Sequence, residues 1–413
     1  MQAVNEVLCT TGPKPLSCIL SYMEKLSRPA LPDEEILLLG VMKGDISHLK
    51  LPEKTGAWRA LCRLADYHGV LPLLFDISEK METIDEETFA LLREEYREIA
   101  SLNLTLTAHL LMITKSLEKE NLRYIALKGP LLSQELYGDI TMRQYSDIDL
   151  FVEEQEVRAV SDIILALGYE PILPMELLER RKFFELDNDF SFRHRVSDLK
   201  VELHWKLFPR RHRMPLSFTA LYDNGRTLLL QKRELVTLSP EDNLLYLTLH
   251  GAKHIFERLI WVGDIDRLIR NIPDTILMKS YHKACAGQME EPFLLGLFLS
   301  QKLFETPLPR ILERDRTPHV DYLVEKTLEY YRERLLFRDE SSKKRARFLF
   351  LADLHQKRRS PYLSLLLALF KPAAADVIAL QLPDRWDFLY PLIRPFRLIL
   401  KYFPGSGRDT HTL

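Results

Sequence analysis

A short apolar run that carries two carboxylates constrains this 413-residue chain more than any other feature. Residues 146–152 read SDIDLFV, so Asp147 and Asp149 alternate with apolar side chains. Side chains alternate between the faces of a β-strand, which puts both aspartates on one face, about 7 Å apart along the backbone. Unpaired buried charges are costly, and a divalent cation would compensate them. The run therefore predicts a strand with one metal-binding face.

The segment before this run predicts a phosphate-binding turn. Residues 124–127 are apolar and predict a buried strand, and Lys128-Gly129-Pro130 then suits a tight turn into a helix over residues 131–137. Backbone N–H groups at a helix start can bind a phosphate. Lys128 could hold a β- or γ-phosphate as a point charge.

A later hairpin supplies a third carboxylate. Residues 190–196 and 200–205 flank Ser197-Asp198, which predicts two antiparallel strands. Glu202 alternates with apolar neighbours and is expected to face the same cleft as the two aspartates. Oxygen ligands suit Mg²⁺ or Mn²⁺. Two such ions can clamp the attacking and leaving oxygens of an in-line phosphoryl displacement.

The rest of the chain has helical periodicity. Residues 85–120 contain no Gly or Pro and predict one long helix packed on the core, and residues 153–167 predict an amphipathic helix that ends at Gly168. A charged helix and loop over the site are expected at residues 176–189, and helices again from about residue 208. We therefore expect an α+β fold, with a small mixed β-sheet core flanked by helical regions. The expected division is a helical N-terminal region (1–120), the core (121–207), a helical C-terminal region (208–404) and a disordered tail (405–413).

Charge and cysteine usage narrow the function classes. The formal net charge is only −2, so the overall charge gives no support to a nucleic-acid partner. The scattered cysteines form no CxxC pair, which fits a reducing cytoplasm (Cys9, Cys18, Cys62, Cys285). No signal peptide is expected, and the apolar run at residues 362–370 is too short to span a bilayer as a helix.

The C-terminal segment has two interpretations. Residues 385–403 mix aromatic, aliphatic and basic side chains, so this arm could lie on a membrane surface. Pro391 and Pro395 are expected to break a long helix, which favours an arm packed across the protein. The expected location is thus cytoplasmic, with contact at the membrane periphery as the alternative.

Several polar residues have a structural as well as a functional interpretation. Asp139 could contact metal or substrate, or cap the loop after Gly138. Arg143 could clamp phosphate, or pair with Asp139 or Asp147. His250 and His254 have a spacing able to bind zinc, but a structural or substrate-pocket role is favoured because no third ligand is evident. The remaining candidates are interpreted as packed histidines (His68, His109), a solvated helix face (Lys253, Arg258) and a charged loop (residues 210–213).

Taken together, these motifs resemble the DNA polymerase beta-like nucleotidyltransferase superfamily, whose pattern is a glycine turn, a strand with two acids and a later strand with a third. Within it, the chain is similar to an uncharacterised bacterial nucleotidyltransferase family. The motifs that carry this resemblance are Leu127-Lys128-Gly129, Tyr137-Gly138-Asp139, Arg143, residues 147–152 and Glu202-Leu203-His204-Trp205. It covers residues 120–270 well and the ends loosely.

The resemblance implies transfer of a nucleoside monophosphate from an NTP, with ATP favoured, to an acceptor such as a small molecule, a polysaccharide precursor or a protein. It implies metal binding by Asp147 and Asp149, with Glu202 as the third acid and candidate general base. Lys128, Gly129, Ser133 and Arg143 are then expected to contact the nucleotide. Many superfamily members have Gly-Ser at the turn, whereas this chain has Lys-Gly-Pro, with Ser133 one turn later. A catalytically degenerate nucleotide-binding or scaffold protein is therefore the alternative.

Overall fold

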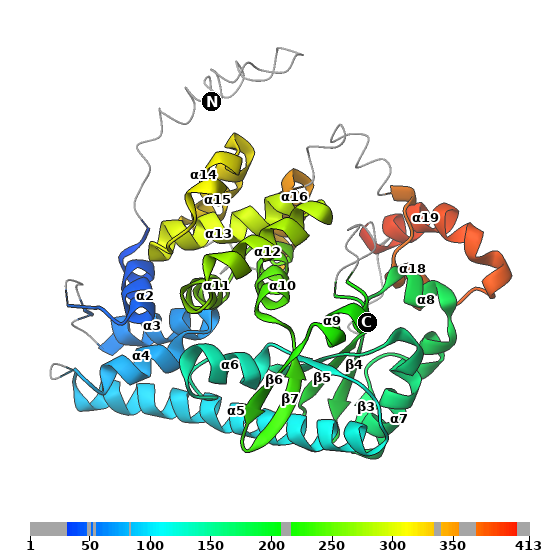
Figure 1. The fold of residues 1–413 in the computed structure, drawn as a ribbon, viewed down its shortest axis with the longest axis horizontal. Helices are drawn as coiled ribbons and strands as arrows, with labels where there is room; N and C mark the ends of the chain where they lie inside the picture. Colours follow the sequence, from blue (N-terminus) through cyan, green and yellow to red (C-terminus); the bar gives the residue numbers. More distant parts are fainter. Residues whose placement is uncertain are drawn as a thin grey trace, which may run out of the picture.

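The computed structural model describes residues 31–47, 51–52, 55–81, 84–207, 216–333, 340–354 and 369–402. The fold is α+β, as predicted. Figure 1 shows a small sheet with one long helix running along one side of it and a stack of helices on the other. The predicted disordered tail, the charged loop at residues 210–213, Cys9 and Cys18 lie outside the described residues.

The N-terminal part is helical, as expected. Its helices are α2 (Asp33–Lys43), α3 (Thr55–His68), α4 (Leu71–Ser78) and the long α5 (Glu86–Lys119). Asp85 caps α5, because its side chain accepts a hydrogen bond of 2.9 Å from the backbone N–H of Thr88. The single long helix predicted for residues 85–120 is confirmed.

The core is a five-stranded mixed sheet in the order β1-β2-β5-β4-β3. Its strands are β1 (Ile125–Leu127), β2 (Asp147–Phe151), β3 (Tyr169–Pro171), β4 (Asp189–His194) and β5 (Lys200–His204). Strands β2 and β5 are parallel, and the other pairs are antiparallel. The hairpin predicted around Ser197-Asp198 is confirmed as β4 and β5.

Alternation along β2 and β5 gives the sheet one apolar and one polar face. Ile148, Leu150, Val201 and Leu203 are buried in one hydrophobic core with side chains of α5 and of α7 (Val157–Ala166). The aspartates of β2 and Glu202 of β5 belong to the opposite face. The helix α5 thus covers the apolar face (Figure 1), and the polar face is turned toward the C-terminal helices.

Short helices connect the strands, and longer helices complete the chain. The connecting elements are α6 (Gly129–Tyr137), η1 (Glu154–Glu156), η2 (Met175–Glu179), α8 (Arg181–Leu186) and α9 (Phe218–Asp223). The C-terminal helices are α10 (Pro240–Lys253), α11 (Leu259–Asn271), α12 (Asp274–Ala286), α13 (Glu290–Phe304), α14 (Arg310–Asp315), α15 (Pro318–Arg332) and α16 (Glu340–Leu354). As predicted, Ser239 caps α10 and accepts a hydrogen bond from the N–H of Asp242.

A second hairpin interrupts the region that was expected to be helical from about residue 208. Strands β6 (Arg226–Leu230) and β7 (Arg233–Thr237) pair through a turn at Gln231 and Lys232, whose φ angles are 47° and 67°. Two-residue turns of this kind usually carry Asn-Gly, and its absence here removed the sequence signal for a hairpin. The hydroxyl of Thr237 donates a 2.8 Å hydrogen bond to the carbonyl of Ala126, which joins the hairpin to β1.

The N-terminal and C-terminal helices share one hydrophobic core. Leu38 of α2 and Leu61 of α3 belong to the same buried cluster as Phe293 of α13 and Tyr331 of α15. Ile125 of β1 also belongs to this cluster, so the helical layer packs directly on the sheet. The two helical regions predicted at residues 1–120 and 208–404 are thus packed together, and their boundaries as separate domains stay a prediction.

A C-terminal arm packs beside α8. It consists of α18 (Ala374–Ala379), η5 (Asp384–Leu389) and α19 (Tyr390–Tyr402). Buried Asp376 pairs with Arg394 at 2.9 Å and with Arg397 at 2.5 Å. The helix break expected at Pro395 is wrong, because α19 runs through that residue, whereas α19 begins at Tyr390, directly before Pro391, and is preceded by the separate 3-10 helix η5. Pro391 lies in the first turn, where a missing N–H costs no helical hydrogen bond. None of the described helices is both long and apolar enough to span a membrane.

Candidate active site

The parallel pairing of β2 and β5 brings three carboxylates together. Asp149 lies opposite Glu202 in the register, and Asp147 lies opposite Lys200. Paired residues of neighbouring strands point to the same face, so these side chains share one surface. Asp149, Glu202 and His204 each offer a ligand atom, and these atoms lie within 4.8 Å of one another.

Asp149 is buried and engaged through both of its oxygens. Oδ2 lies 3.0 Å from Nζ of Lys128, and Oδ1 lies 2.9 Å from Nε2 of His204. The side chain of Asp149 is 2% exposed and that of Lys128 is 13% exposed. Burial by itself would raise the pKa of Asp149, but Lys128 and His204 hold it well below its usual range.

Glu202 is held by two basic neighbours. Its Oε1 forms an ion pair with Lys200, and its Oε2 lies 3.5 Å from Nε2 of His204. The hydrogen bond from His204 is the main cause that lowers the pKa of Glu202 to about 2, against the opposing effect of burial. For His204, burial favours the neutral form, but hydrogen bonds to Asp149 and Glu202 outweigh it and raise the pKa to about 9.

Asp147 is the carboxylate of this cluster without a direct partner, although Lys128 and Lys200 favour its charged form. Among the described residues it forms neither an ion pair nor a hydrogen bond, and burial followed by repulsion from Asp149 raises its pKa to about 6. A carboxylate without a partner, beside two others, is a natural place for a divalent cation. The residues present therefore fit Mg²⁺ or Mn²⁺, with Asp147, Asp149 and Glu202 as candidate ligands.

The turn after β1 sets the position of Lys128. Its φ is 43°, a left-handed conformation that few residues other than glycine adopt, and the next residue, Gly129, has a φ of 53°. The ammonium of Lys128 lies against Asp149 and 5.7 Å from the ring centroid of Tyr246. A Cβ added to Gly129 would meet no atom within 4 Å, so there is open space beside the start of α6.

Ser133 and Arg143, two of the predicted nucleotide contacts, are buried away from the carboxylates. The hydroxyl of Ser133 donates to the carbonyl of Asp139 at 2.7 Å and accepts from the N–H of Arg143 at 3.2 Å. The guanidinium of Arg143 forms a bidentate pair with Asp264 of α11, at 3.0 and 2.8 Å. Tyr137 donates to the same carboxylate at 2.8 Å. These contacts fix the loop before β2 against α11.

The structure gives the contacts of two residues of this loop whose roles have alternatives. Asp139 caps its own turn, because its Oδ1 accepts a 2.7 Å hydrogen bond from the backbone N–H of Thr141. The ion-pair partner of Arg143 is Asp264, so the alternative in which it pairs with Asp139 or Asp147 is wrong. The nucleotide contacts expected of Ser133 and Arg143 stay a prediction.

Aromatic and imidazole rings of α10 and α11 form a wall beside Lys128. The rings of His250, His254 and Trp261 lie with centroids 4.7 to 5.5 Å apart. Burial lowers the pKa of His250 well below its ordinary value and that of His254 to about 3, so both are neutral at neutral pH. Neither belongs to the group of described residues that could hold a metal ion. The ring packing thus agrees with the structural or substrate-pocket role rather than with a zinc site.

The two other histidines have packing roles, as expected. His68 is buried and accepts a hydrogen bond from the backbone N–H of Leu259 at 3.4 Å. His109 is hydrogen-bonded through Nδ1 to the hydroxyl of Tyr169 at 2.8 Å.

Three further residues of the polar face were missed as site residues. Lys200 and His204 flank Glu202 on β5, and Asp189 of β4 lies opposite His204. Burial is the main cause that raises the pKa of Asp189. The alternation that identified Glu202 also contained the signal for Lys200 and His204, because all three are separated by one apolar residue.

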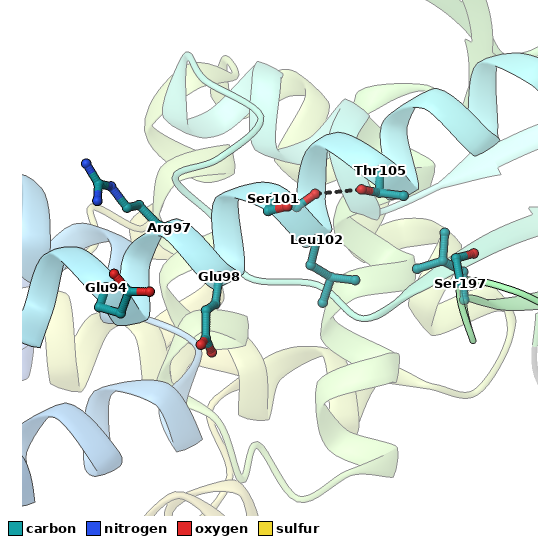
Figure 2. Close-up of a pocket in the computed structure, with 8 residues that line it drawn as sticks. Glu94, Arg97, Glu98, Ser101, Leu102, Thr105 and Ser197 are labelled. Atoms are coloured by element: carbon teal, nitrogen blue, oxygen red, sulfur yellow. Dashed lines mark hydrogen bonds between the residues drawn. The ribbon is translucent and has the colours of Figure 1, made fainter.

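A surface depression elsewhere has no part in this constellation. It has a volume of about 530 Å³ and lies between α5 and the turn that joins β4 to β5 (Figure 2). Its lining side chains come from Glu94, Arg97, Glu98, Ser101, Leu102, Thr105, Ser197 and Leu199. Because α5 packs on the apolar face of the sheet, this depression is separated from the carboxylates by the sheet itself.

Comparison with known proteins identifies a family for more than half of the chain. Residues 54–305 match the model of a family described as "Uncharacterised nucleotidyltransferase". A search of curated proteins found no match.

Solved structures show weaker likenesses. A lincomycin-bound lincosamide antibiotic adenylyltransferase, LnuA, is 17% identical, with 38% of this chain and 93% of that chain covered and a TM-score of 0.28. ANT(2")-Ia in complex with adenylyl-2"-tobramycin is 15% identical, with 48% and 98% covered and a TM-score of 0.27. An antigenic nucleotidyltransferase-like protein from Paracoccidioides brasiliensis is 16% identical, with 46% and 91% covered and a TM-score of 0.29. These TM-scores are too low for a residue-by-residue comparison.

Proposed function

The chain belongs to the uncharacterised nucleotidyltransferase family, and from this premise we propose that it transfers a nucleoside monophosphate from an NTP to an acceptor in a metal-dependent reaction. The observation that carries the proposal is Asp147, a carboxylate without a partner beside Asp149 and Glu202. Such a cluster favours a bound cation, and phosphoryl-transfer sites use divalent metals for this purpose.

In the proposed reaction, an acceptor oxygen attacks the α-phosphorus of the NTP. A bond forms between this oxygen and phosphorus, the bond to the β-phosphate oxygen breaks, and pyrophosphate leaves. The acceptor proton passes to a carboxylate of the cluster, for which Glu202 is the candidate. A bound divalent ion would neutralise charge on the phosphates and orient them. Asp147, Asp149 and Glu202 would hold this ion, with His204 keeping two of the three in place.

The turn after β1 is the proposed grip on the triphosphate. Lys128 provides a fixed positive charge, and the open space beside Gly129 lies at the N-terminus of α6, where backbone N–H groups favour an anion. Ser133 and Arg143 are buried, so we propose that they act on nucleotide binding through the loop they hold. Lys128 already lies against one oxygen of Asp149, and this contact bears on the number of metal ions that the site can bind.

A screen for pyrophosphate release tests the reaction. The full chain is incubated with Mg²⁺ or Mn²⁺, each of the four NTPs, and acceptors drawn from small hydroxylated molecules, polysaccharide precursors and proteins. We expect release with ATP as the favoured nucleotide, and none from Asp147→Asn. Release that is the same in wild type and in Asp147→Asn would contradict the site assignment.

A non-catalytic nucleotide sensor or scaffold is the second candidate. The observation that favours it is the double engagement of Asp149, whose two oxygens lie beside Lys128 and His204. Tight, Mn²⁺-dependent NTP binding without pyrophosphate release across the whole acceptor panel is the outcome that would select it. We place either activity in the cytoplasm, where free thiols such as those of Cys62 and Cys285 stay reduced.

A further inference from the structure

Lys128 lies where a second cation would be expected. In a two-metal site the ions lie about 3.5–4 Å apart and share ligands on both sides of the reacting phosphate. Asp149 is the central carboxylate of this cluster, and its Oδ2 is already 3.0 Å from the ammonium of Lys128. We propose that Lys128 replaces one of the two metal ions, so that the site binds a single divalent cation beside Asp147, Asp149 and Glu202. This inference rests on the proposed function and specifies its metal requirement.

The ammonium of Lys128 is held firmly. Its side chain is 13% exposed and that of Asp149 is 2% exposed, so the pair is shielded from water. The ammonium also lies 5.7 Å from the ring centroid of Tyr246, so it has a second neighbour besides Asp149. Moving Nζ aside to admit a second ion would leave a buried charge without its partner, which is strongly unfavourable. The left-handed backbone of Lys128 also fixes the direction in which the side chain leaves the turn.

Charge balance favours one divalent ion. Three carboxylates need compensation, and two lysines already lie on them: Lys128 on Asp149, and Lys200 on Glu202. Three carboxylates with two lysines and one divalent ion carry the same formal charge as three carboxylates with two divalent ions and no lysine. With Lys128 and Lys200 in place, a second divalent ion would therefore add two positive charges beyond this balance.

The available ligand atoms also indicate a single divalent cation. Oε1 of Glu202 is engaged by Lys200, and Oδ2 of Asp149 by Lys128. The atoms that no lysine engages are the carboxylate of Asp147, Oε2 of Glu202 and Oδ1 of Asp149, and the last two lie 3.5 and 2.9 Å from Nε2 of His204. Among the described residues, one group of three potential ligands is found, formed by Asp149, Glu202 and His204, and the carboxylate of Asp147 belongs to the same face of the sheet.

Counting bound ions tests the inference directly. The full chain, without nucleotide, is titrated with Mn²⁺ at pH 7.5, and the free ion is measured by electron paramagnetic resonance. We expect one Mn²⁺ per wild-type chain. In Lys128→Met the released oxygen of Asp149 becomes a ligand, and we expect two Mn²⁺ per chain whose signals are coupled because the ions share Asp149.

Two control variants separate charge from packing. Lys128→Arg keeps the positive charge and should bind one Mn²⁺. Lys43→Met removes a lysine whose partner is Glu305, 3.0 Å away at the protein surface, and should also bind one. Circular dichroism checks that each variant is folded. Lys128→Gly, which suits the positive φ, replaces Lys128→Met if that variant does not fold.

Each outcome has a distinct meaning. Two Mn²⁺ bound to the wild type would overturn the replacement of a metal ion by Lys128. One Mn²⁺ bound both to the wild type and to a folded variant without the ammonium (Lys128→Met or Lys128→Gly) would overturn it as well. Either result would leave the proposed function standing. No Mn²⁺ bound to the wild type would instead remove the metal site on which the proposed function depends.

Discussion

Asp149 and Glu202 lie directly opposite each other on the parallel strands β2 and β5. This register puts both carboxylates on the polar face, while Leu150 and Leu203, the next pair along, are fully buried on the other. A shift of one residue in either strand would exchange the two faces and bury the charged set. The apolar packing of the sheet on α5 therefore also holds the candidate ligands in place.

The ion pair between Arg143 and Asp264 is expected to be structural. Arg143→Met should destabilise the protein by roughly 3–5 kcal/mol, because Asp264 would be left as a buried charge without its partner. Urea unfolding measures the loss. The matched control is Lys43→Met, whose exposed pair with Glu305 should contribute less than about 1 kcal/mol. If Arg143→Met unfolds like the wild type yet no longer binds NTP, the guanidinium contacts phosphate instead.

The wall of rings on α10 should make the protein sensitive to acid. The pKa of His254 is lowered by burial to about 3, below the ordinary value of 6.5, so the unfolded chain takes up the proton first. Stability contributed by neutral His254 is therefore present above pH 6.5 and is lost as the pH falls below that value. Between about pH 7.5 and 5, the stability advantage of wild type over His254→Gln should shrink by up to about 2 kcal/mol.

The pH dependence of stability expected from His254 can be distinguished from that expected from His204. The raised pKa of His204, about 9, gives the opposite sign: its contribution is full below pH 6.5 and is lost as the pH rises through about 9. Chemical denaturation at several pH values measures the free energy of unfolding and so reveals both trends. Parallel pH profiles for wild type and His254→Gln would show that His254 titrates as if it were exposed.

The last helix should give the protein a weak affinity for membrane surfaces. Phe388, Leu392, Phe396 and Ile399 are 68%, 58%, 69% and 54% exposed, and their spacing puts them along one side of η5 and α19. The arm is thus both packed, through Asp376, and apolar on its outer side. We expect partial co-sedimentation with liposomes that is lost in Leu392→Asp with Phe396→Asp. Leu380→Asp, an exposed leucine just beyond α18, should retain it. A wild type that stays in the supernatant would remove this contact.

The backbone of the Lys128–Gly129 turn should tolerate no side chain at Gly129 without strain. Its φ of 53° is unfavourable for any residue with a Cβ, although no atom lies within 4 Å of that position. Gly129→Ala should therefore destabilise by about 1–2 kcal/mol through the backbone alone. Gly56→Ala, also with no atom within 4 Å but without a positive φ, is the control and should be neutral or stabilising in thermal melts. Equal effects of the two substitutions would contradict this explanation.

The residues that could be predicted from the sequence are those whose signal is local. Alternation around Asp147 and Asp149 predicted strand β2, the turn at Ser197-Asp198 predicted the hairpin that carries Glu202, and the absence of Gly and Pro predicted α5. The α+β fold follows from these elements. What was missed depends on contacts between distant segments or on an unusual local turn.

Arg143 illustrates the distant contacts, because its partner lies on α11, a helix that no local pattern connects with the loop before β2. His204 shows the same limit, since its role follows from the parallel pairing of β2 and β5. Strands β6 and β7 were missed for the local reason that Gln231-Lys232 adopts a turn without Asn or Gly.

The most direct test of the central claim is calorimetry of NTP binding in the presence and absence of Mn²⁺. Asp198→Asn, an exposed aspartate in the β4–β5 turn, serves as the matched control. We predict Mn²⁺-dependent binding to the wild type and to this control, and no such binding to the folded Asp147→Asn, Asp149→Asn double variant. Unchanged Mn²⁺-dependent binding to the double variant would contradict the assignment of these carboxylates as the metal ligands.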